Sequence, residues 1–596
     1  MDYKNLYELV ERGAERFNNK SAFVMKKENK WQTFNWIEVK ELVKLIAKSL
    51  IKLGVNKSNT VCILSNTRVE WILIDLAIVS IGGVTVPIYQ SNTPSQCEYI
   101  INDSEAKIVF VEDKNQLEKV LEIKPHTPHL TKIINISTDD SENNYILSFK
   151  KLIESGEDID DDIFIKRNKD IQLTDIATII YTSGTTGIPK GAVITHENMF
   201  AQIIGATNVL PSLEGMSTLC FLPLAHVFAR ACQYIFIYSG TTQWFAESLE
   251  KVPENLKEAK PHLFIAVPRI FEKSYNKIIS TIQGKGKLTI NLFNWAVNIG
   301  KTVTKNIKDK DKIGISLKLK YKIANTLVFN KIKKVFGGKL VFVVSGGAPL
   351  STTISEFFHS IGILILEGYG LSETTSATHV NQFNNFKLGT VGLPIDGIKT
   401  KLAEDGEVLV RGKSIMLGYY KNEKLTSEMI DQMGWFHTGD IGEIDSEGFL
   451  KIVDRKKDII VTSGGKKISP QYIESCIKNS KYINEVMVYG DRRNFLSALI
   501  VINFETVSEW AKGKNIIFKN IKDLSRKNEV FQLIEKEIEK INSNLAHFET
   551  IKKFTLLEKE FTLEGGEMTP TQKLKRTNII KNYQKLLDQF YEDRFN

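Results

Sequence analysis

Residues 181–191 read Tyr-Thr-Ser-Gly-Thr-Thr-Gly-Ile-Pro-Lys-Gly and directly follow the apolar run 176–180, which predicts a β-strand. The segment holds three glycines and four short hydroxyl side chains. A loop of this composition presents bare backbone N–H groups and hydroxyl donors, which favour the binding of phosphate oxygens. Gly191 stands where a Walker A motif has Ser or Thr, so the loop is of another type. Instead of a plain glycine-rich turn, we predict a phosphate site made by Thr182, Ser183, Gly184, Thr185, Thr186, Gly187 and Lys190.

Short apolar runs and helical patterns alternate on both sides of this loop, up to about residue 450. The runs 61–65, 107–111, 340–345 and 363–367 predict strands, and helical patterns such as 36–53 and 70–81 lie between them. Such alternation predicts an α/β body with parallel strands. The most apolar stretch, 71–89, carries Asp75 and two glycines, so we interpret it as a buried helix that leads into a strand and not as a membrane span.

Five consecutive charged residues, 454–458, separate the two apolar runs 450–453 and 459–462. We interpret them as an exposed linker and place the main domain boundary there. The predicted domains are therefore a large N-terminal body with several subdomains (1–453) and a small α+β domain (459–596), joined by the linker 454–458.

A basic segment, 275–338, interrupts the large body. Its pattern is helical and rich in lysine, with apolar residues interleaved. A solvated helical hairpin packed on the body is the simpler interpretation of such charged helix faces. The alternative is a surface that rests on anionic lipid, as basic amphipathic helices do.

The composition is that of a globular protein, with 596 residues, 42% hydrophobic and 25% charged. The five cysteines form no metal-ligand or CxxC pattern, which favours reduced thiols in a cytoplasm. The net charge of +9 is a mild excess, and no aromatic-studded basic strand or groove-reading motif supports nucleic-acid binding. We expect a cytoplasmic protein and leave open a peripheral contact with the inner face of the membrane. The oligomeric state stays open.

A second motif, residues 367–374, reads Glu-Gly-Tyr-Gly-Leu-Ser-Glu-Thr. Together with the loop at 181–191 it resembles the signatures of the adenylate-forming superfamily, which includes acyl-CoA synthetases, luciferases and peptide-synthetase adenylation domains. The resemblance runs from about residue 20 to residue 580. It implies that Tyr369 lies near an adenine, that Ser372, which replaces the usual Thr, bonds an α-phosphate, and that Glu373 holds Mg²⁺ together with Thr185. Glu367, Gly368 and Gly370 complete this part of the nucleotide site.

Further blocks match the same family. The turn at 345–350 is similar to one that lies along adenine and ribose, which assigns Gly347, Ala348 and Pro349 to the pocket. Asp440 resembles the ribose-binding aspartate, and Arg455 resembles an arginine that approaches the same sugar and phosphate. Lys573 matches the catalytic lysine, whose charge would stabilise the transition state. The neighbouring Lys575 and Arg576 are expected to be solvated.

Some features resemble the long-chain fatty acyl-CoA synthetase branch: residues 222–228 (Leu-Pro-Leu-Ala-His-Val-Phe), the basic insertion and residues 569–576. This branch implies ATP, Mg²⁺ and coenzyme A, and a fatty acyl-CoA formed through an acyl-adenylate. His226 would border the acyl and thiol channel, and Ser463 and Lys466 would face coenzyme A. Because the two steps need different groups at one centre, the resemblance also implies that the small domain is mobile about a hinge at 454–458, with Lys457 as its pivot. Arg230 stands where some bacterial relatives carry a gating tryptophan. The alternatives are a fatty acyl-AMP or acyl-carrier-protein ligase, and a non-catalytic lipid-binding protein on the same fold.

Overall fold

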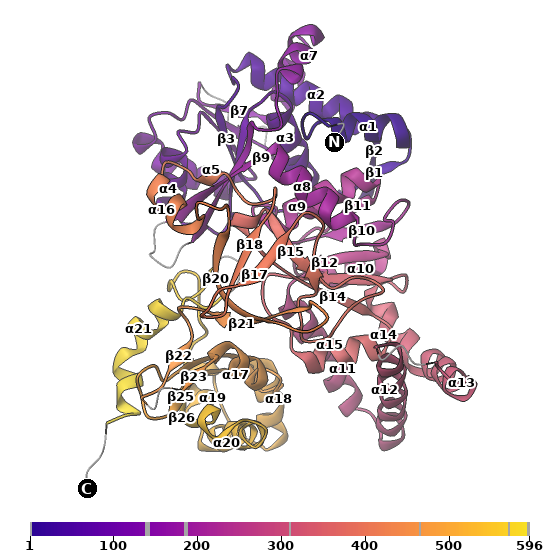
Figure 1. Cartoon of the computed structure of the whole chain (residues 1–596), viewed down its shortest axis with the longest axis vertical. Helices are drawn as coiled ribbons and strands as arrows, with labels where there is room; N and C mark the ends of the chain where they lie inside the picture. Colours follow the sequence, from indigo (N-terminus) through magenta and orange to yellow (C-terminus); the bar gives the residue numbers. More distant parts are fainter. Residues whose placement is uncertain are drawn as a thin grey trace.

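Two large sheets form the body of the protein in the computed structural model, which describes residues 3–137, 144–183, 189–308, 312–463, 466–569 and 573–592 (Figure 1). The first sheet has the order β16 (Leu393–Pro394), β15 (Ser376–Val380), β14 (Leu364–Leu371), β13 (Phe342–Ser345), β12 (Leu263–Ala266), β10 (Ser217–Cys220), β11 (Thr242–Phe245), β1 (Ser21–Lys27), β2 (Lys30–Asn35). The second has the order β19 (Gly418–Tyr419), β9 (Pro189–Thr195), β8 (Ile176–Ser183), β4 (Val84–Ile88), β3 (Thr60–Leu64), β5 (Ile108–Val111), β6 (Lys132–Asn135), β7 (Ile146–Ser148).

Each sheet is parallel through its middle, as the alternating pattern predicts: β11, β10, β12, β13 and β14 in one, and β8, β4, β3, β5, β6 and β7 in the other. Helices α3 (Val69–Ser80) and α8 (His196–Thr207) contact strands of both sheets. Helix α3 is buried along nearly its whole length, because residues of every face are apolar. The apolar stretch 71–89 is therefore the buried helix and strand that we predict.

The remaining helices of the body pack around these layers. They include α9 (Val227–Ser239), α1 (Glu8–Phe17), α2 (Trp36–Lys52), α4 (Pro94–Asp103), α5 (Lys114–Ile123), α6 (Phe149–Ser155), α7 (Asp161–Lys169), α10 (Val252–Ala259), α15 (Thr352–Ser360) and α16 (Glu423–Met429).

Arg230 lies in the core and not at the mouth of a channel. Its guanidinium donates to both carboxylate oxygens of Asp75 on α3, and both side chains are fully buried. A further nitrogen donates to Thr178 on β8, while Tyr234 and Thr85 donate to Asp75. The charge pair is thus surrounded by hydrogen bonds, which a buried ion pair requires. It ties α9 to α3 and to the strand that leads into the phosphate loop.

A third sheet and a small C-terminal unit follow the body. The third sheet consists of the antiparallel strands β17 (Lys399–Leu402), β18 (Glu407–Arg411), β20 (Phe436–Ile444) and β21 (Leu450–Arg455). The small unit, which we define as the residues after Asp458, lies below this sheet in Figure 1 and has its own apolar core. It comprises β22 (Ile460–Val461), β23 (Lys467–Ile468), α17 (Pro470–Ile477), β24 (Ile483–Tyr489), β25 (Leu496–Ile502), α18 (Phe504–Gly513), α19 (Ile521–Ser525), α20 (Asn528–Asn542), β26 (Ile551–Leu556) and α21 (Arg576–Gln589).

The predicted α/β body with a smaller α+β unit is confirmed, but the charged run 454–458 is not exposed throughout. Asp454 is a buried residue of β21, and its carboxylate accepts hydrogen bonds from Ser469 Oγ (2.6 Å) and Gln471 N (3.1 Å) at the start of α17. A carboxylate at a helix N-terminus is favoured by the unpaired N–H groups there. The exposed part of the run is therefore shorter than the sequence suggests. Arg576, expected to be solvated, pairs with Glu474.

The basic segment forms helices that extend from the lower right of the body in Figure 1. It begins earlier than predicted, at Pro268, and contains α11 (Pro268–Gln283), α12 (Lys287–Lys308), α13 (Ile315–Ala324), a π-helical turn (Asn325–Phe329) and α14 (Asn330–Lys333). Gly300 allows α12 to approach α15, because a Cβ there would lie 2.1 Å from the Ser360 carbonyl oxygen.

The buried Asp75–Arg230 pair gives a first prediction. Asp75→Leu or Arg230→Met leaves one charge without its counter-charge in the core, so each should lower the free energy of unfolding by about 3–5 kcal/mol. The double variant Asp75→Leu/Arg230→Met buries no charge and should be less destabilised than either single variant. Guanidinium unfolding of the four proteins measures this. If the two losses simply add, the pair is not coupled as described.

Candidate active site

The site residues lie where the ends of several strands meet. The phosphate loop joins β8 to β9, the turn at 345–350 follows β13, and the second motif continues from β14. The strands β20 and β21 supply Asp440 and Arg455. In parallel sheets, ligands characteristically bind beyond the carboxyl ends of the strands, where loops can form a crevice.

Asp440 is the residue on which the others converge. Its side chain is buried, and one carboxylate oxygen accepts a hydrogen bond from the Tyr369 hydroxyl at 2.6 Å. The other lies 3.2 Å from Arg455 Nε, on the strand directly opposite. Burial raises the pKa of Asp440, and the Arg455 charge and the Tyr369 hydrogen bond oppose this rise. The same burial, together with the charge of Asp440, raises the pKa of the Tyr369 hydroxyl, which therefore stays a donor.

Glu373 lies in a tight 3₁₀ turn, Ser372–Thr374, that follows β14. Thr375 continues the turn in the left-handed region, with φ of 56°, and a side chain at Gly370 would collide with the Ser376 carbonyl oxygen. This close backbone packing fixes the direction of Glu373. Its carboxylate accepts a hydrogen bond from the Tyr419 hydroxyl at 2.8 Å.

Tyr419 is a site residue that the motif comparison misses. It lies on β19, beside β9, and the Lys190 ammonium stands 5.9 Å from its ring centre. Tyr419 therefore connects the end of the phosphate loop to Glu373. The residues 184–187 of that loop, including Thr185 as a predicted metal ligand, lie outside the described residues. Thr182 and Ser183 form the end of β8 and pair with Lys190 and Pro189 of β9.

Lys573 belongs to the small unit, and the charges of Arg455, Asp440 and Glu373 act on it. Solvent reaches its side chain, but the surrounding protein removes part of its hydration. This desolvation, together with the nearby Arg455 guanidinium, lowers the pKa of Lys573 to about 8, while Asp440 and Glu373 oppose the change. Its backbone is held in a short hairpin, in which Thr569 exchanges hydrogen bonds with Lys573.

His226 caps the start of α9, and its Nδ1 accepts a hydrogen bond from Phe228 N at 3.1 Å. Burial, with a contribution from the Lys573 charge, lowers the pKa of His226 to about 4. The imidazole is therefore neutral near pH 7, and its proton resides on Nε2. The ring of Phe228 packs against Gly346 and so joins the start of α9 to the turn at 345–350.

The turn with Gly347, Ala348 and Pro349 is exposed, and Gly347 has φ of 84°. The Glu367 side chain stabilises this turn. This carboxyl is buried, contacts the backbone N–H groups of Leu350 and Gly389, and has its pKa raised to about 8 by burial. Glu367 therefore holds the turn in place instead of facing the crevice, whereas Gly368 gives β14 close contact with β15.

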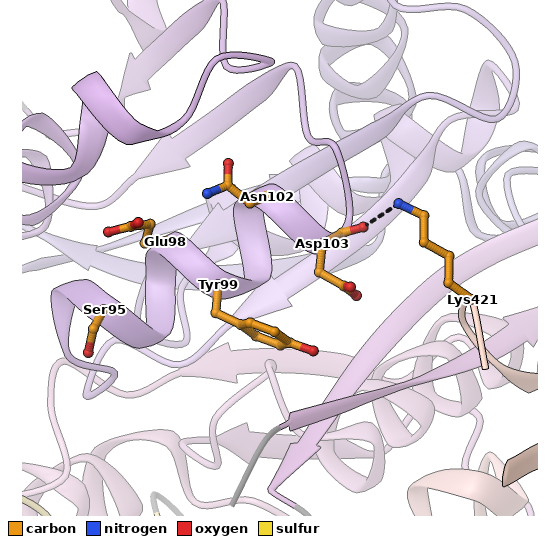
Figure 2. Close-up of a pocket in the computed structure, with 6 residues that line it drawn as sticks. All are labelled: Ser95, Glu98, Tyr99, Asn102, Asp103 and Lys421. Atoms are coloured by element: carbon orange, nitrogen blue, oxygen red, sulfur yellow. Dashed lines mark hydrogen bonds between the residues drawn. The ribbon is translucent and has the colours of Figure 1, made fainter.

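Helix α4 braces both strands that flank the phosphate loop. Figure 2 shows its residues Ser95, Glu98, Tyr99, Asn102 and Asp103 together with Lys421. Tyr181 on β8 donates to Asp103 (2.5 Å), and Tyr99 donates to the Pro189 carbonyl on β9 (3.2 Å). Lys421 Nζ donates to the Asp103 carbonyl. An open pocket of about 570 Å³ lies here, and none of the residues predicted from motifs lines it; its walls are Ser95, Glu98, Tyr99, Asn102, Asp103 and Lys421.

The surroundings of the three remaining predicted residues, Ser463, Lys466 and Lys457, are as follows. Ser463 donates to Asn494, and Lys466 lies 5.8 Å from the Phe548 ring centre, so both make these contacts within the small unit. Lys457 is exposed, and desolvation, Arg455 and Lys190 lower its pKa. The charges of Arg455 and Lys190 thus both act on Lys457.

The site offers a magnesium ion one acidic ligand, Glu373. Within the described ranges, no group of three or more His, Cys, Asp or Glu residues is arranged to hold a metal. Mg²⁺ bound to phosphates needs only one or two protein carboxylates. Glu373, held by a single hydrogen bond from Tyr419, fits that role.

Comparison with known proteins shows the family of the chain. Residues 10–420 match the model of the AMP-binding enzyme family, and residues 457–595 match that of the AMP-binding enzyme C-terminal domain. The long-chain-fatty-acid–CoA ligase FadD15 of Mycobacterium bovis is 36% identical over 566 residues, which cover 94% of this chain and 92% of that protein. The human long-chain-fatty-acid–CoA ligase ACSBG2 is 32% identical over 98% of this chain and 92% of its own length.

Solved structures show the same fold. The anthranilate CoA ligase AuaEII, in complex with anthranoyl-AMP, has a TM-score of 0.75 and 20% identity over 98% of both chains. The adenylation domain of a carboxylate reductase from Mycobacterium chelonae has a TM-score of 0.76 and 20% identity, over 100% of this chain and 92% of that domain. The two family matches and the relatives above 30% identity show that this chain belongs to the AMP-binding, adenylate-forming enzyme family.

Proposed function

We propose that this protein is a long-chain fatty acid–CoA ligase, which converts a fatty acid, ATP and coenzyme A into acyl-CoA, AMP and pyrophosphate through an acyl-adenylate. The observation that carries the proposal is the convergence of Tyr369, Arg455 and Lys573 on Asp440 in a chain of this family. The relatives named as long-chain-fatty-acid–CoA ligases support the substrate class.

Each site residue has a chemical task under this proposal. The buried Asp440 carboxylate accepts both ribose hydroxyls, and Tyr369 and the turn at 347–349 border the adenine. Ser372 and the loop from Thr182 to Lys190 hold the phosphates, and Glu373, with Thr185, holds a Mg²⁺ ion, which neutralises phosphate charge when bound. Lys573 places an ammonium where negative charge grows at the α-phosphate during attack by the fatty acid carboxylate. The neutral His226 lies beside the acyl and thiol path.

The two half-reactions require different groups at one centre. Lys573 serves adenylation, and we propose that the small unit then turns about Lys457 in the hinge 454–458, so that Ser463 and Lys466 approach the coenzyme A side. The domains are accordingly the body 1–453 and the small unit 459–596. The arrangement described here has Lys573 near Asp440 and corresponds to the adenylation state.

The acyl chain length gives a second prediction. Because each buried CH₂ contributes roughly 0.8 kcal/mol, acids of about twelve carbons or more should have the highest kcat/KM. Pyrophosphate release across a series of acids, with and without coenzyme A, measures this. Best turnover on acetate or propionate would contradict the assignment. Acyl transfer only to a holo-carrier protein would identify the carrier-protein ligase, and absence of pyrophosphate release with all acids would identify a lipid-binding protein.

The role of Lys573 gives a third prediction. Lys573→Ala should slow acyl-adenylate formation by about 10²- to 10³-fold, the range for losing one preorganised charge-stabilising group. Thioester formation from presynthesised acyl-adenylate should stay nearly unchanged. Lys457→Pro should have the opposite effect, because proline fixes φ near −65° and would block a pivot there. Single-turnover measurements of each half-reaction test both variants, and equal losses in both steps would refute alternation.

The pH dependence provides a control on the same residue. The charged form of Lys573 is lost as the pH rises through about 8. The kcat/KM of adenylation, which reports the free enzyme, should therefore fall above this pH. Lys573→Arg should move this alkaline limb upward, since an arginine stays protonated.

We further propose that the protein acts in the cytoplasm and binds peripherally to an anionic membrane surface. No helix in the described parts of the chain is long and apolar enough to cross a bilayer. Residues 285–339 contain fourteen lysines and two aspartates, a net charge of +12 against +9 for the whole chain, so the rest carries −3. This concentration of charge complements an anionic lipid surface.

Helix α13 presents an apolar stripe beside these lysines. Ile315 is 87% exposed and Leu319 59%, and Ile323 and Leu327 continue the stripe at four-residue spacing. The opposite side, with Ala324, faces the protein. An exposed apolar stripe flanked by Lys318, Lys320 and Lys322 is the arrangement of an interfacial helix, in which apolar side chains enter the bilayer while lysines stay at the headgroups.

This surface gives a fourth prediction. The protein should sediment with vesicles that contain phosphatidylglycerol and much less with neutral phosphatidylcholine vesicles. Binding should weaken with salt, because surface charges are screened over about 8 Å at physiological ionic strength. Ile315→Asn/Leu319→Asn should lower the affinity about tenfold, since the burial of these two side chains is lost.

Ile163→Asn on α7 is the matched control, because Ile163 is also an exposed isoleucine on a helix, outside the basic segment. Its binding should equal that of the parent protein. Equal sedimentation with neutral and anionic vesicles would disprove lipid binding. A concentration-dependent increase in mass that Ile315→Asn/Leu319→Asn abolishes would show instead that a second copy covers the stripe.

A further inference from the structure

Helix α11 of the body contacts the small unit through an ion pair. Arg269, at the start of the helix, pairs with Glu485 on β24 through one guanidinium nitrogen. The other donates to the Asn484 side chain at 3.1 Å. Glu485 is also 3.2 Å from Lys478 Nζ of its own unit. Its side chain is only 7% exposed, so the carboxylate is largely enclosed by these two cations.

Other groups on both sides complete this contact. Glu272, one turn after Arg269, faces the same cluster: burial raises its pKa, and Lys478, Glu485 and Arg269 act on it. At the far end of α11, Lys481 Nζ donates to the Gln283 side chain at 2.8 Å. The small unit therefore contacts this helix at both ends, and the alternating charges at its first turn define the register of that contact.

The ion pair joins residues from opposite sides of the run 454–458, so any large rotation there must break it. Once Arg269 leaves, Glu485 keeps Lys478 and gains water, and no isolated buried charge remains. The contact can therefore open and close at a modest free-energy cost. Such an ion pair favours one domain orientation without locking it.

We infer that Arg269 and Glu485 are positioning residues for adenylation: their ion pair holds the small unit in the orientation that brings Lys573 to Asp440. The inference rests on the proposed two-step function and adds the contact that sets the balance between its two states. Neither residue touches the site itself. Their effect passes through the position of Lys573, and it should therefore appear in one half-reaction only.

The fifth prediction concerns Arg269→Ala. Losing an ion pair of about 1 kcal/mol should slow acyl-adenylate formation roughly fivefold and leave thioester formation from presynthesised adenylate unchanged or faster. Arg269→Lys, which keeps the charge, should retain most of the adenylation rate. Lys273→Ala is the matched control, because it removes an exposed cation from the same helix. It should leave both half-reactions unchanged.

A double-variant cycle separates positioning from general damage. In a Lys573→Ala background, Arg269→Ala should cause no further loss of adenylation, because the residue that it positions is gone. Trypsin cleavage at Lys456 and Lys457 should be about fivefold faster in Arg269→Ala than in the parent protein, which reports domain orientation without activity. Equal loss in both half-reactions, an additive loss without Lys573 or unchanged cleavage would overturn the inference. A parent protein that forms no adenylate from any fatty acid would instead refute the proposed function, while the cleavage comparison would still test the ion pair.

Discussion

The buried carboxylate of Asp440 is the constraint on which the site depends. A carboxylate that is 4% exposed needs partners that replace the lost water: a hydroxyl and a guanidinium contact Asp440, and the charge of a lysine acts on it without a direct contact. Tyr369 comes from the end of the first sheet, Arg455 from the strand that leads into the charged run, and Lys573 from the small unit. The free energy that keeps Asp440 ionised therefore also favours one arrangement of the body, the third sheet and the small unit.

The approach of two cations to Asp440 also affects the pKa of the basic residues. Arg455 and Lys573 both approach Asp440, and each makes the other less favourable, which is part of the reason that the pKa of Lys573 falls to about 8. With Lys190 and Lys457 nearby, four cations stand against the carboxylates of Asp440, Glu373 and Asp458, so the positive charge exceeds the negative. An excess of this kind suits a phosphate-bearing ligand, because the ligand supplies the missing negative charge.

The sequence predicts the fold class and most strands of the body, because apolar runs bounded by turn residues depend on local patterns. It also supplies candidate site residues through motifs of fixed spacing, such as Asp440 and Lys573, which the structure brings near each other. It does not predict their partners. Tyr419 lies 46 residues from Glu373, and Arg269 lies 216 residues from Glu485. Such pairs depend on how sheets and domains pack. Asp454 differs from the prediction for the same reason: a charged run predicts exposed residues, whereas the position of the helix that Asp454 caps depends on tertiary packing.

The distribution of charge along the chain shows why the net charge alone is a poor guide to the binding partner. The +9 of the whole chain suggests a mildly basic protein, yet residues 285–339 carry more than all of it and the rest is slightly acidic. Lysines spread evenly would attract any polyanion weakly, whereas lysines gathered on helices that also expose Ile315 and Leu319 combine charge with apolar area. An anionic lipid bilayer offers both charge and an apolar phase, whereas a nucleic acid does not, so this combination supports the proposed lipid surface over a nucleic acid. The position of the charge therefore says more about the partner than its sum does.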